Sequence, residues 1–293
     1  MTMQKTLDRA IMLQETAGPS GLSAGYRVDG RVYENYLSNE AWAAFKEQMQ
    51  NGNPIAYEMY TQGGGRELEE RRRGKYTFPP KMASFGSSSR MIYNLMKNVP
   101  GFLFEKKLPT SIGGKANLDG FAETETKCVF VEAKCREPYG EVQNEIADKY
   151  RPLYEAITAS GNNNLTCNIV ALSPGKMQVE FFFDGNPIRN FDVKQMICHL
   201  LGIATAYLKG EYGKPIDFVY LLYNPTQLPF EDDTLHQIYH QECTEAQGVD
   251  FAGLFYDILA FLQAEKQLGT GRDIAGIAGN FSFRICDQYT MKL

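Results

Sequence analysis

The sequence lacks several features that would assign it to a familiar class. No apolar run approaches the roughly 18 residues that a membrane-spanning helix needs. There is no C-x-x-C pair, no P-loop or dinucleotide glycine fingerprint, and no G-x-S-x-G of a serine hydrolase. These absences argue against a transmembrane protein, a nucleotide-binding fold of those types and a serine hydrolase.

The N-terminus and the cysteines indicate a reducing compartment. Lys5, Asp8 and Arg9 interrupt the first residues, which therefore do not form the apolar core of a signal peptide. The six cysteines are scattered, so free thiols are expected rather than a disulfide framework. We expect a cytoplasmic protein without a membrane partner.

Positive charge is concentrated in one segment of an acidic chain. The net charge is −5, yet residues 66–107 hold ten Lys and Arg against four acids, an excess of six positive charges. Such a segment is typical of a surface that binds an anionic polymer. The candidate contacts are Arg71, Arg72, Arg73, Lys75 and Arg90. The alternative is a salt-bridged helix face, because Glu67, Glu69 and Glu70 stand beside the arginines.

The pattern of apolar residues predicts an α/β protein of 293 residues with a mixed central sheet between helices. Residues 1–60 are interpreted as an N-terminal extension with one helix, loosely organised up to residue 25, and residues 61–293 as the α/β domain. Helices are expected at 38–50, 66–73, 90–97, 141–159, 192–208, 233–243 and 249–267. Strands are expected at 102–108, 116–123, 128–134, 165–172, 179–183, 218–223 and 281–286.

Two carboxylates and a lysine mark the ends of two neighbouring expected strands. Asp119 lies in the strand at 116–123, and Glu132-Ala133-Lys134 closes the strand at 128–134, thirteen residues later. Residues two apart in a strand point to the same face, so Glu132 and Lys134 should emerge together, with Asp119 coming from the next strand. A short turn between the strands favours this meeting.

Carboxylates beside an ammonium group suit metal-dependent phosphodiester cleavage. Mg²⁺ prefers hard oxygen ligands, which Asp119, Glu132 and the carbonyl of Ala133 can supply. Lys134 can orient the attacking water and stabilise developing charge. Mn²⁺ could replace Mg²⁺. E-x-K alone is weak evidence, because Glu105-Lys106-Lys107 also matches but has no acid on a preceding strand.

The Asp119 and Glu132-Ala133-Lys134 pattern resembles the PD-(D/E)XK nuclease superfamily, and its surroundings resemble a bacterial branch of restriction endonucleases. The resemblance implies a restriction-endonuclease-like mixed sheet flanked by helices, magnesium as the cofactor and DNA as the substrate. It makes Asp119 and Glu132 metal ligands and Lys134 the catalytic lysine. Cutting both strands would favour a homodimer.

Some expected family features are altered in this chain. Leu118 replaces the proline often found before the first acid. Glu67, and after it Glu70, are the candidates for an additional carboxylate from a preceding helix. Gln143 is a candidate substrate contact, although Ala147 does not complete a Gln-x-x-x-Tyr pattern.

Two other readings remain open. A catalytically inactive nuclease-fold module could bind DNA or a protein partner. A zinc-bearing structural protein is the other alternative, because His236, His240 and Cys243 share one face of an expected helix.

Overall fold

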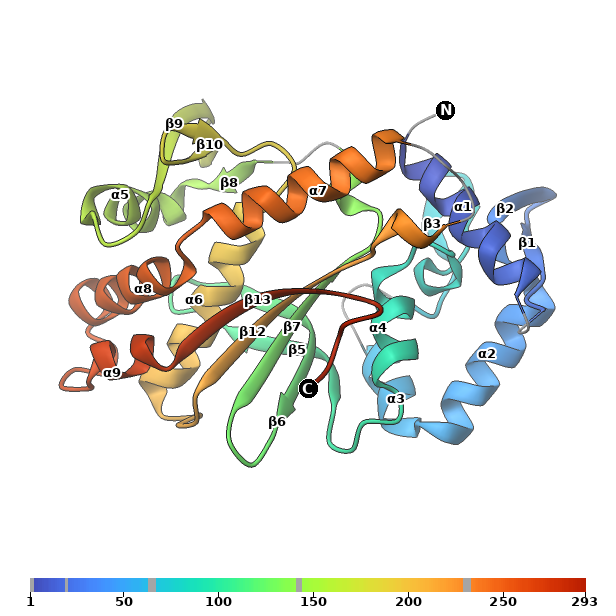
Figure 1. Cartoon of the computed structure of the whole chain (residues 1–293), viewed down its shortest axis with the longest axis horizontal. Coiled ribbons are helices and arrows are strands. Elements are labelled where there is room, and N and C mark those ends of the chain that lie inside the picture. The colour runs from blue at the N-terminus through green and yellow to red at the C-terminus, as the bar shows by residue number, and fades with distance from the viewer. Residues whose placement is uncertain (1–2, 19–20, 63–66, 141–143, 229–232) are drawn as a thin grey trace.

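A five-stranded mixed sheet forms the centre of this computed structural model, which describes residues 3–18, 21–62, 67–140, 144–228 and 233–293 (Figure 1). Its strand order is β13-β12-β7-β6-β5. The strands are β5 (Leu103–Pro109), β6 (Lys115–Glu123), β7 (Cys128–Lys134), β12 (Ile216–Leu222) and β13 (Phe281–Asp287). No helix in these ranges is long and apolar enough to cross a membrane.

The direction of the strands follows from their connections. Short turns join β5, β6 and β7, which pair antiparallel and confirm the expected meander. Longer crossings lead to β12 and β13, which run parallel to β7. Every residue of β7 and β12 is buried, as expected for strands covered on both faces.

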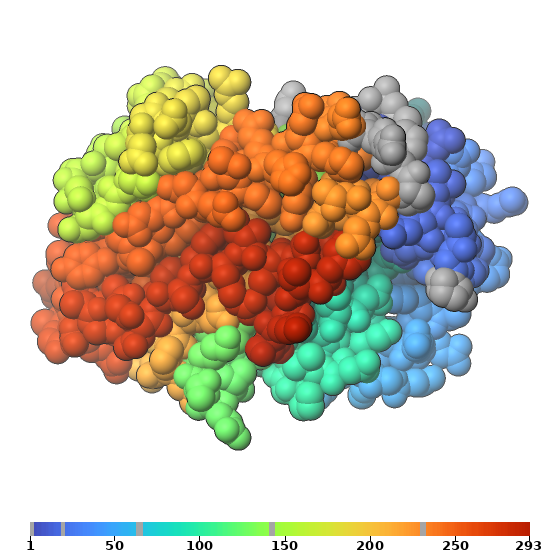
Figure 2. Space-filling view, viewed as in Figure 1, coloured from blue at the N-terminus to red at the C-terminus, as the bar shows by residue number. Residues whose placement is uncertain are grey.

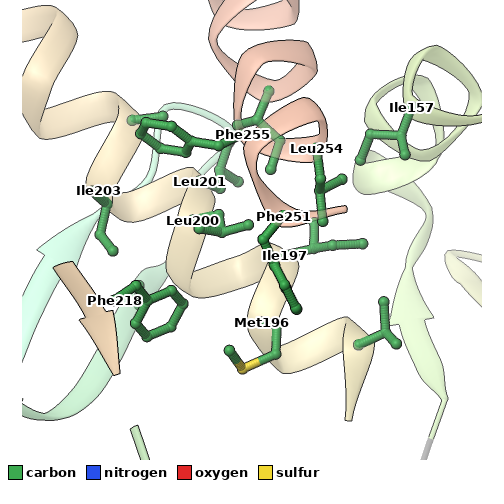
Figure 3. Close-up of a cluster of buried hydrophobic side chains, with 14 of the residues drawn as sticks. Ile157, Met196, Ile197, Leu200, Leu201, Ile203, Phe218, Phe251, Leu254 and Phe255 are labelled. Atoms are coloured by element: carbon green, nitrogen blue, oxygen red, sulfur yellow. The ribbon is translucent and has the colours of Figure 1, made fainter. Parts of the chain in front are cut away.

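One face of the sheet is covered by helices from the C-terminal half (Figure 1). They are α5 (Arg151–Ser160), α6 (Val193–Lys209), α8 (Phe251–Lys266) and α9 (Ile274–Gly279). Figure 3 shows α6 between the sheet and α8, with Leu200 and Leu201 beside Phe255. Burying one such side chain contributes about 1.5–3 kcal/mol, so this core fixes the position of α6.

The opposite face is covered by helices from the N-terminal part of the chain. They are α1 (Met3–Ala17), α2 (Asn39–Gly52), α3 (Pro54–Gln62) and α4 (Ser88–Met96). Leu7 and Trp42 belong to the same buried cluster as Val131 and Val219 of the sheet. The N-terminal extension therefore contributes one of the layers that enclose the central sheet.

Helix α7 (Asp233–Gly248) crosses the end of the sheet at which β7 and β12 finish (Figure 1). Leu235, near its start, joins the core of the N-terminal helices, whereas Ala246, near its end, joins the other core. In Figure 2, α7 crosses one end of the visible face, and the green turn between β6 and β7 projects at the opposite end. Helix α7 therefore covers the carboxyl ends of β7 and β12.

Smaller sheets and turns complete the fold. Hairpins are formed by β1 (Ala24–Val28) with β2 (Arg31–Leu37) and by β9 (Leu165–Ser173) with β10 (Lys176–Phe183). Strands β8 (Glu145–Ala147) and β11 (Asn186–Pro187) also pair with β10. The 3₁₀ turns are η1 (Lys81–Ala83), η2 (Glu137–Tyr139), η3 (Asp148–Tyr150) and η4 (Pro225–Gln227).

Two helix caps were predicted correctly from the sequence. The Ser38 side chain accepts from the Ala41 N–H at the start of α2, and Asp192 accepts from Gln195 N–H at the start of α6. Both helices begin within two residues of their expected starts.

Three local predictions are wrong. A helix was expected at 66–73, but the described residues 67–73 form a turn followed by the hairpin of β3 (Arg71–Arg73) and β4 (Tyr76–Phe78), in which Gly74 takes φ 61°. The loosely organised lead-in contains α1. A helix was expected at 141–159, but among the described residues β8 and η3 precede it and α5 begins only at Arg151, with Pro152 in the first turn, where its missing N–H costs no hydrogen bond.

Candidate functional site

The candidate site is formed where the ladder between β6 and β7 opens. Regular pairing ends at Gly120 and Val131, and the Asp119 carboxylate then accepts a hydrogen bond of 2.8 Å from the N–H of Ala133. The side chain of Asp119 thus replaces a strand carbonyl as the acceptor for β7. This bond brings Asp119 to the backbone between Glu132 and Lys134.

Glu132 and Lys134 form an ion pair on one face of β7. Lys134 Nζ lies 2.9 Å from Glu132 Oε1, and the exposed fractions of the two residues are 7% and 2%. Two residues apart on a strand, they share a face as expected. Their burial means that neither charge is screened by bulk water.

Helix α6 supplies two further side chains to this pair. Gln195 donates 2.7 Å from Nε2 to Glu132 Oε1, and its own Oε1 accepts from Lys134 Nζ. One turn later, the Nε2 of buried His199 lies 2.9 Å from Glu132 Oε2, without the alignment of a hydrogen bond. Glu132 is therefore enclosed by Lys134, Gln195 and His199.

The charges of these groups are set by burial and by one another. Burial raises the pKa of the Glu132 carboxyl, but the Lys134 ammonium and then His199 more than offset this effect and hold that pKa below its usual value. Burial lowers the pKa of Lys134, whereas the Glu132 carboxylate raises it above its usual value overall. At neutral pH the pair is ionised, so Lys134 is a cation.

Asp119 differs from Glu132 in its electrostatic setting. Burial and then the negative charge of Glu132 raise the pKa of Asp119 well above its usual value, against the opposing effects of Lys134 and the Ala133 N–H. Ionising Asp119 in this place is therefore unfavourable. A bound cation beside Asp119 and Glu132 would relieve that cost.

Glu67 lies in a turn, so the prediction that it belongs to a helix is wrong. It is buried, and its Oε1 is 2.9 Å from Lys81 Nζ. Its charge acts on Glu105 of β5, whose pKa rises to about 7, chiefly through burial and then through Glu67. Glu105 takes φ 52° where the pairing of β5 with β6 is interrupted opposite Asp119.

The predicted DNA contacts differ in their surroundings. Arg72, Arg73 and Lys75 are exposed on the hairpin that follows Glu67, and the partly buried Arg71 donates to the carbonyl of Pro79. The preceding Glu70 is also exposed. Gln143 lies outside the described residues.

Arg90 is turned into the protein. Its exposed fraction is 2%, its Nη2 lies 3.0 Å from Glu15 Oε1 of α1, and the same atom donates to the carbonyl of Phe85. We therefore leave Arg90 out of the proposed DNA contacts.

Sequence reasoning missed Gln195, His199 and Glu105 as neighbours of the site. Glu105 was not counted as a candidate because no acid lies on a strand before its E-x-K. That criterion does not consider that Glu105 lies opposite Asp119 in the neighbouring strand. Gln195 and His199 are four residues apart on α6 and hence on one helix face. That spacing was the available signal, but no local pattern shows that this face meets β7.

The ligand types suit magnesium better than zinc. Asp119, Glu132 and the carbonyl of Ala133 offer hard oxygen atoms. Within the described parts of the chain, no group of three or more His, Cys, Asp or Glu residues is arranged so that it could hold a metal ion. His236, His240 and Cys243 on α7 thus do not form such a group. Ligation through Oε1 of Glu132 would displace Gln195 or Lys134, whereas Oε2 of Glu132 has no hydrogen-bond partner among the described residues.

The fold and the site together define a mixed α/β protein with a carboxylate–lysine cluster at the carboxyl end of a central strand. No protein-family model, curated protein or solved structure matches this chain. The resemblance to the nuclease superfamily therefore stays a prediction, and the function is inferred from the residues themselves.

Proposed function

We propose that this protein is a magnesium-dependent deoxyribonuclease with a restriction-endonuclease-like fold of the PD-(D/E)XK type. The observation that carries the proposal is the bond from Ala133 N–H to the Asp119 carboxylate, at the residue between Glu132 and Lys134. It joins the acid of one strand to the E-x-K of the next at an opening in the sheet.

Each residue of the cluster has a role in this proposal. Asp119, Glu132 and the carbonyl of Ala133 would hold Mg²⁺ or Mn²⁺, with Glu67 as an additional carboxylate nearby. The metal, when bound, supplies positive charge for the phosphate and lowers the pKa of a bound water. Lys134, kept cationic by Glu132, orients the attacking water and stabilises the negative charge that develops on the phosphate.

The exposed basic hairpin is the proposed DNA contact. Arg72, Arg73 and Lys75 project from β3 and its turn, five to eight residues after Glu67, with Arg71 at their base. Phosphate contacts of this kind supply affinity without sequence specificity. A homodimer, which would let two sites cut both strands, and a contribution from Gln143 remain parts of the proposal.

An inactive DNA- or protein-binding module is the second candidate. It is favoured by the closed surroundings of Glu132, whose Oε1 receives bonds from both Lys134 and Gln195. If those bonds persist in the presence of metal, only Oε2 of Glu132, beside His199, is left to serve as a ligand. The two candidates predict different responses to Mg²⁺.

The test is cleavage of plasmid and linear DNA with Mg²⁺, Mn²⁺ or a chelator. We expect divalent-dependent cleavage that is lost in Asp119→Asn and in Lys134→Met, each assayed where circular dichroism shows the variant to be folded. Lys107→Ala is the matched control, because Lys107 closes another E-x-K of the chain but is exposed on β5. Intact DNA under all metal conditions, with protein shown to be folded by circular dichroism, would refute the nuclease and leave the binding module.

A further inference from the structure

An apolar hollow of about 400 Å³ lies between β8, η3, α5 and the first half of α6. Its walls include Ile146, Tyr150, Tyr154, Ile197 and Leu201. Figure 3 shows Ile197 on the side of α6 that is turned toward α5. Pockets that enclose small molecules have volumes of about 300–1,000 Å³ and mostly apolar walls. The apolar hollow therefore has the size and the lining of a site for a small ring system.

The hydroxyl of Tyr154 is the unexplained polar group in this hollow. Tyr154 is only 3% exposed, yet its hydroxyl forms no hydrogen bond with the described residues. Burial raises the pKa of this hydroxyl, and Cys198 and Asp192, which also line the hollow, raise it further. The hydroxyl is therefore directed toward these two lining groups. A buried hydroxyl without a partner is costly, and a ligand with an acceptor atom would remove that cost.

The charged groups that line the apolar hollow already have partners. Glu145 forms an ion pair with Lys176, Asp192 accepts from the Gln195 N–H, and Lys194 is engaged as well. An anionic ligand would meet two carboxylates here without a free cation, so an uncharged ligand is favoured. Such a ligand can still donate to Asp192, because a carboxylate accepts more than one hydrogen bond.

A nucleobase combines the properties that these walls require. It is a flat, uncharged ring whose edge carries acceptor and donor atoms, for the Tyr154 hydroxyl and the Asp192 carboxylate respectively. Its faces stack on aromatic side chains. Tyr150 supplies such a side chain, and its hydroxyl donates a hydrogen bond of 3.1 Å to the carbonyl of Gly113. An alkyl chain would fill the same space but leave the Tyr154 hydroxyl without a partner.

The apolar hollow adjoins the carboxylate–lysine cluster. Gln195 lines the hollow, donates to Glu132 and accepts from Lys134. Cys198 of the hollow is also close enough to Glu132 for this carboxylate, after burial, to raise the pKa of its thiol. A DNA strand whose phosphate lies at the cluster can therefore present a base to the hollow.

We propose that the apolar hollow binds an unpaired base of the DNA substrate, with the Tyr154 hydroxyl donating a hydrogen bond to the edge of the base. The base must leave the stack to enter, which costs least in a single strand or at an unpaired position. The proposal rests on the proposed function, because the base belongs to the DNA that the cluster would cut. It narrows that substrate to DNA with at least one unpaired base.

Protection of Cys198 from alkylation tests the proposal without requiring cleavage. The probes are the four deoxynucleosides, a short single-stranded oligonucleotide and the same strand built from abasic sugars, each with a chelator present. Alkylation by iodoacetamide is followed at each cysteine by mass spectrometry. Cys243 of α7 is the internal control, because it is also half-buried but does not line the hollow.

The expected result is protection that depends on the base. A deoxynucleoside or the single strand at about four times its Kd should slow the alkylation of Cys198 about fivefold and leave Cys243 unchanged. The abasic strand keeps the phosphates but should not protect Cys198. Equal protection by the abasic strand, or no protection by deoxynucleosides, would overturn the base site. Protection by deoxynucleosides but not by the single strand would overturn its assignment to DNA.

Tyr154→Phe is the decisive variant. It keeps the buried ring and removes the hydroxyl, so the Kd for deoxynucleosides should rise about fivefold, as expected for one lost hydrogen bond. Tyr256→Phe, which removes a hydroxyl from a half-buried tyrosine of α8, should bind as the wild type does. An unchanged Kd in Tyr154→Phe would contradict the proposed hydrogen bond. Because protection is measured without cleavage, failure to cut DNA would contradict the nuclease and not this hollow.

Discussion

Replacing Lys134 by methionine should destabilise the fold strongly, and replacing Glu132 as well should restore much of the loss. The perturbation removes one member of an ion pair whose side chains are 9% and 2% exposed. Lys134→Met leaves a buried carboxylate without its cation. Glu132→Met leaves a buried ammonium group, and the double variant leaves neither charge.

The magnitude follows from the burial of the pair. Exposed ion pairs contribute about 0–1 kcal/mol, whereas breaking a buried pair by removing one partner costs about 3–5 kcal/mol. The double variant should cost only about 1–3 kcal/mol, mainly because Gln195 loses its partners. The coupling energy between Glu132 and Lys134 is then at least about 3 kcal/mol.

Urea unfolding can be followed through the fluorescence of the single tryptophan, Trp42, which is buried in α2. Glu145 and Lys176 provide a matched control, because they form an ion pair that is 48% and 58% exposed. Their double-mutant cycle should give under about 1 kcal/mol. A coupling below 1 kcal/mol for Glu132 and Lys134, equal to the control, would refute the buried network.

Three further changes test other parts of the structure. Asp119→Asn keeps an acceptor for the Ala133 N–H but removes the Asp119 carboxyl. Because the pKa of this carboxyl is raised in the folded protein, its contribution to stability is present at acidic pH and is lost as the pH rises through that pKa. The variant should therefore match the wild type near pH 4 and melt about 2–4 °C higher at pH 8 in a calorimetric scan, while its DNA cleavage is lost. Arg72→Ser should weaken DNA binding and reduce the slope of log affinity against log salt by about one, measured by fluorescence anisotropy; an unchanged slope would remove Arg72 from the interface. Gly202→Ala would place a Cβ 2.6 Å from that of Ala116 and should cost about 1–3 kcal/mol in urea unfolding, and a neutral result would show that α6 can shift from the sheet.

The meander and the meeting of Asp119 with the E-x-K were accessible to sequence reasoning because both are local. Apolar runs and the turn at 124–127 predict the hairpin, and antiparallel pairing then brings an acid thirteen residues upstream to the end of β7. The burial of β12 was likewise readable from its continuous apolar run. Short sequence separation leaves few alternative arrangements.

The rest of the site depends on distant contacts that no short window contains. Gln195 is 61 residues from Lys134 and meets it only because α6 packs on the sheet. Arg90 was predicted to face DNA, yet it pairs with Glu15 of a helix that the sequence did not predict. The charge pattern at 66–73 suited a helix, but pairing of Arg71 with Phe78 across the Gly74 turn produced a hairpin.

The same contacts that organise Glu132 also limit what it can do. Lys134 and Gln195 keep its carboxylate ionised and oriented, but both direct their bonds to Oε1, and His199 lies beside Oε2. At Oε1 a metal ion would compete with both Gln195 and Lys134, whereas Oε2 has no hydrogen-bond partner among the described residues and lies beside His199. Because Gln195 also accepts a hydrogen bond from Lys134, a metal ion that displaced it would remove one of the two bonds that hold the ammonium group. Metal binding and substrate positioning would then be coupled through one side chain of α6, and Gln195→Ala should make metal affinity and DNA affinity independent of each other.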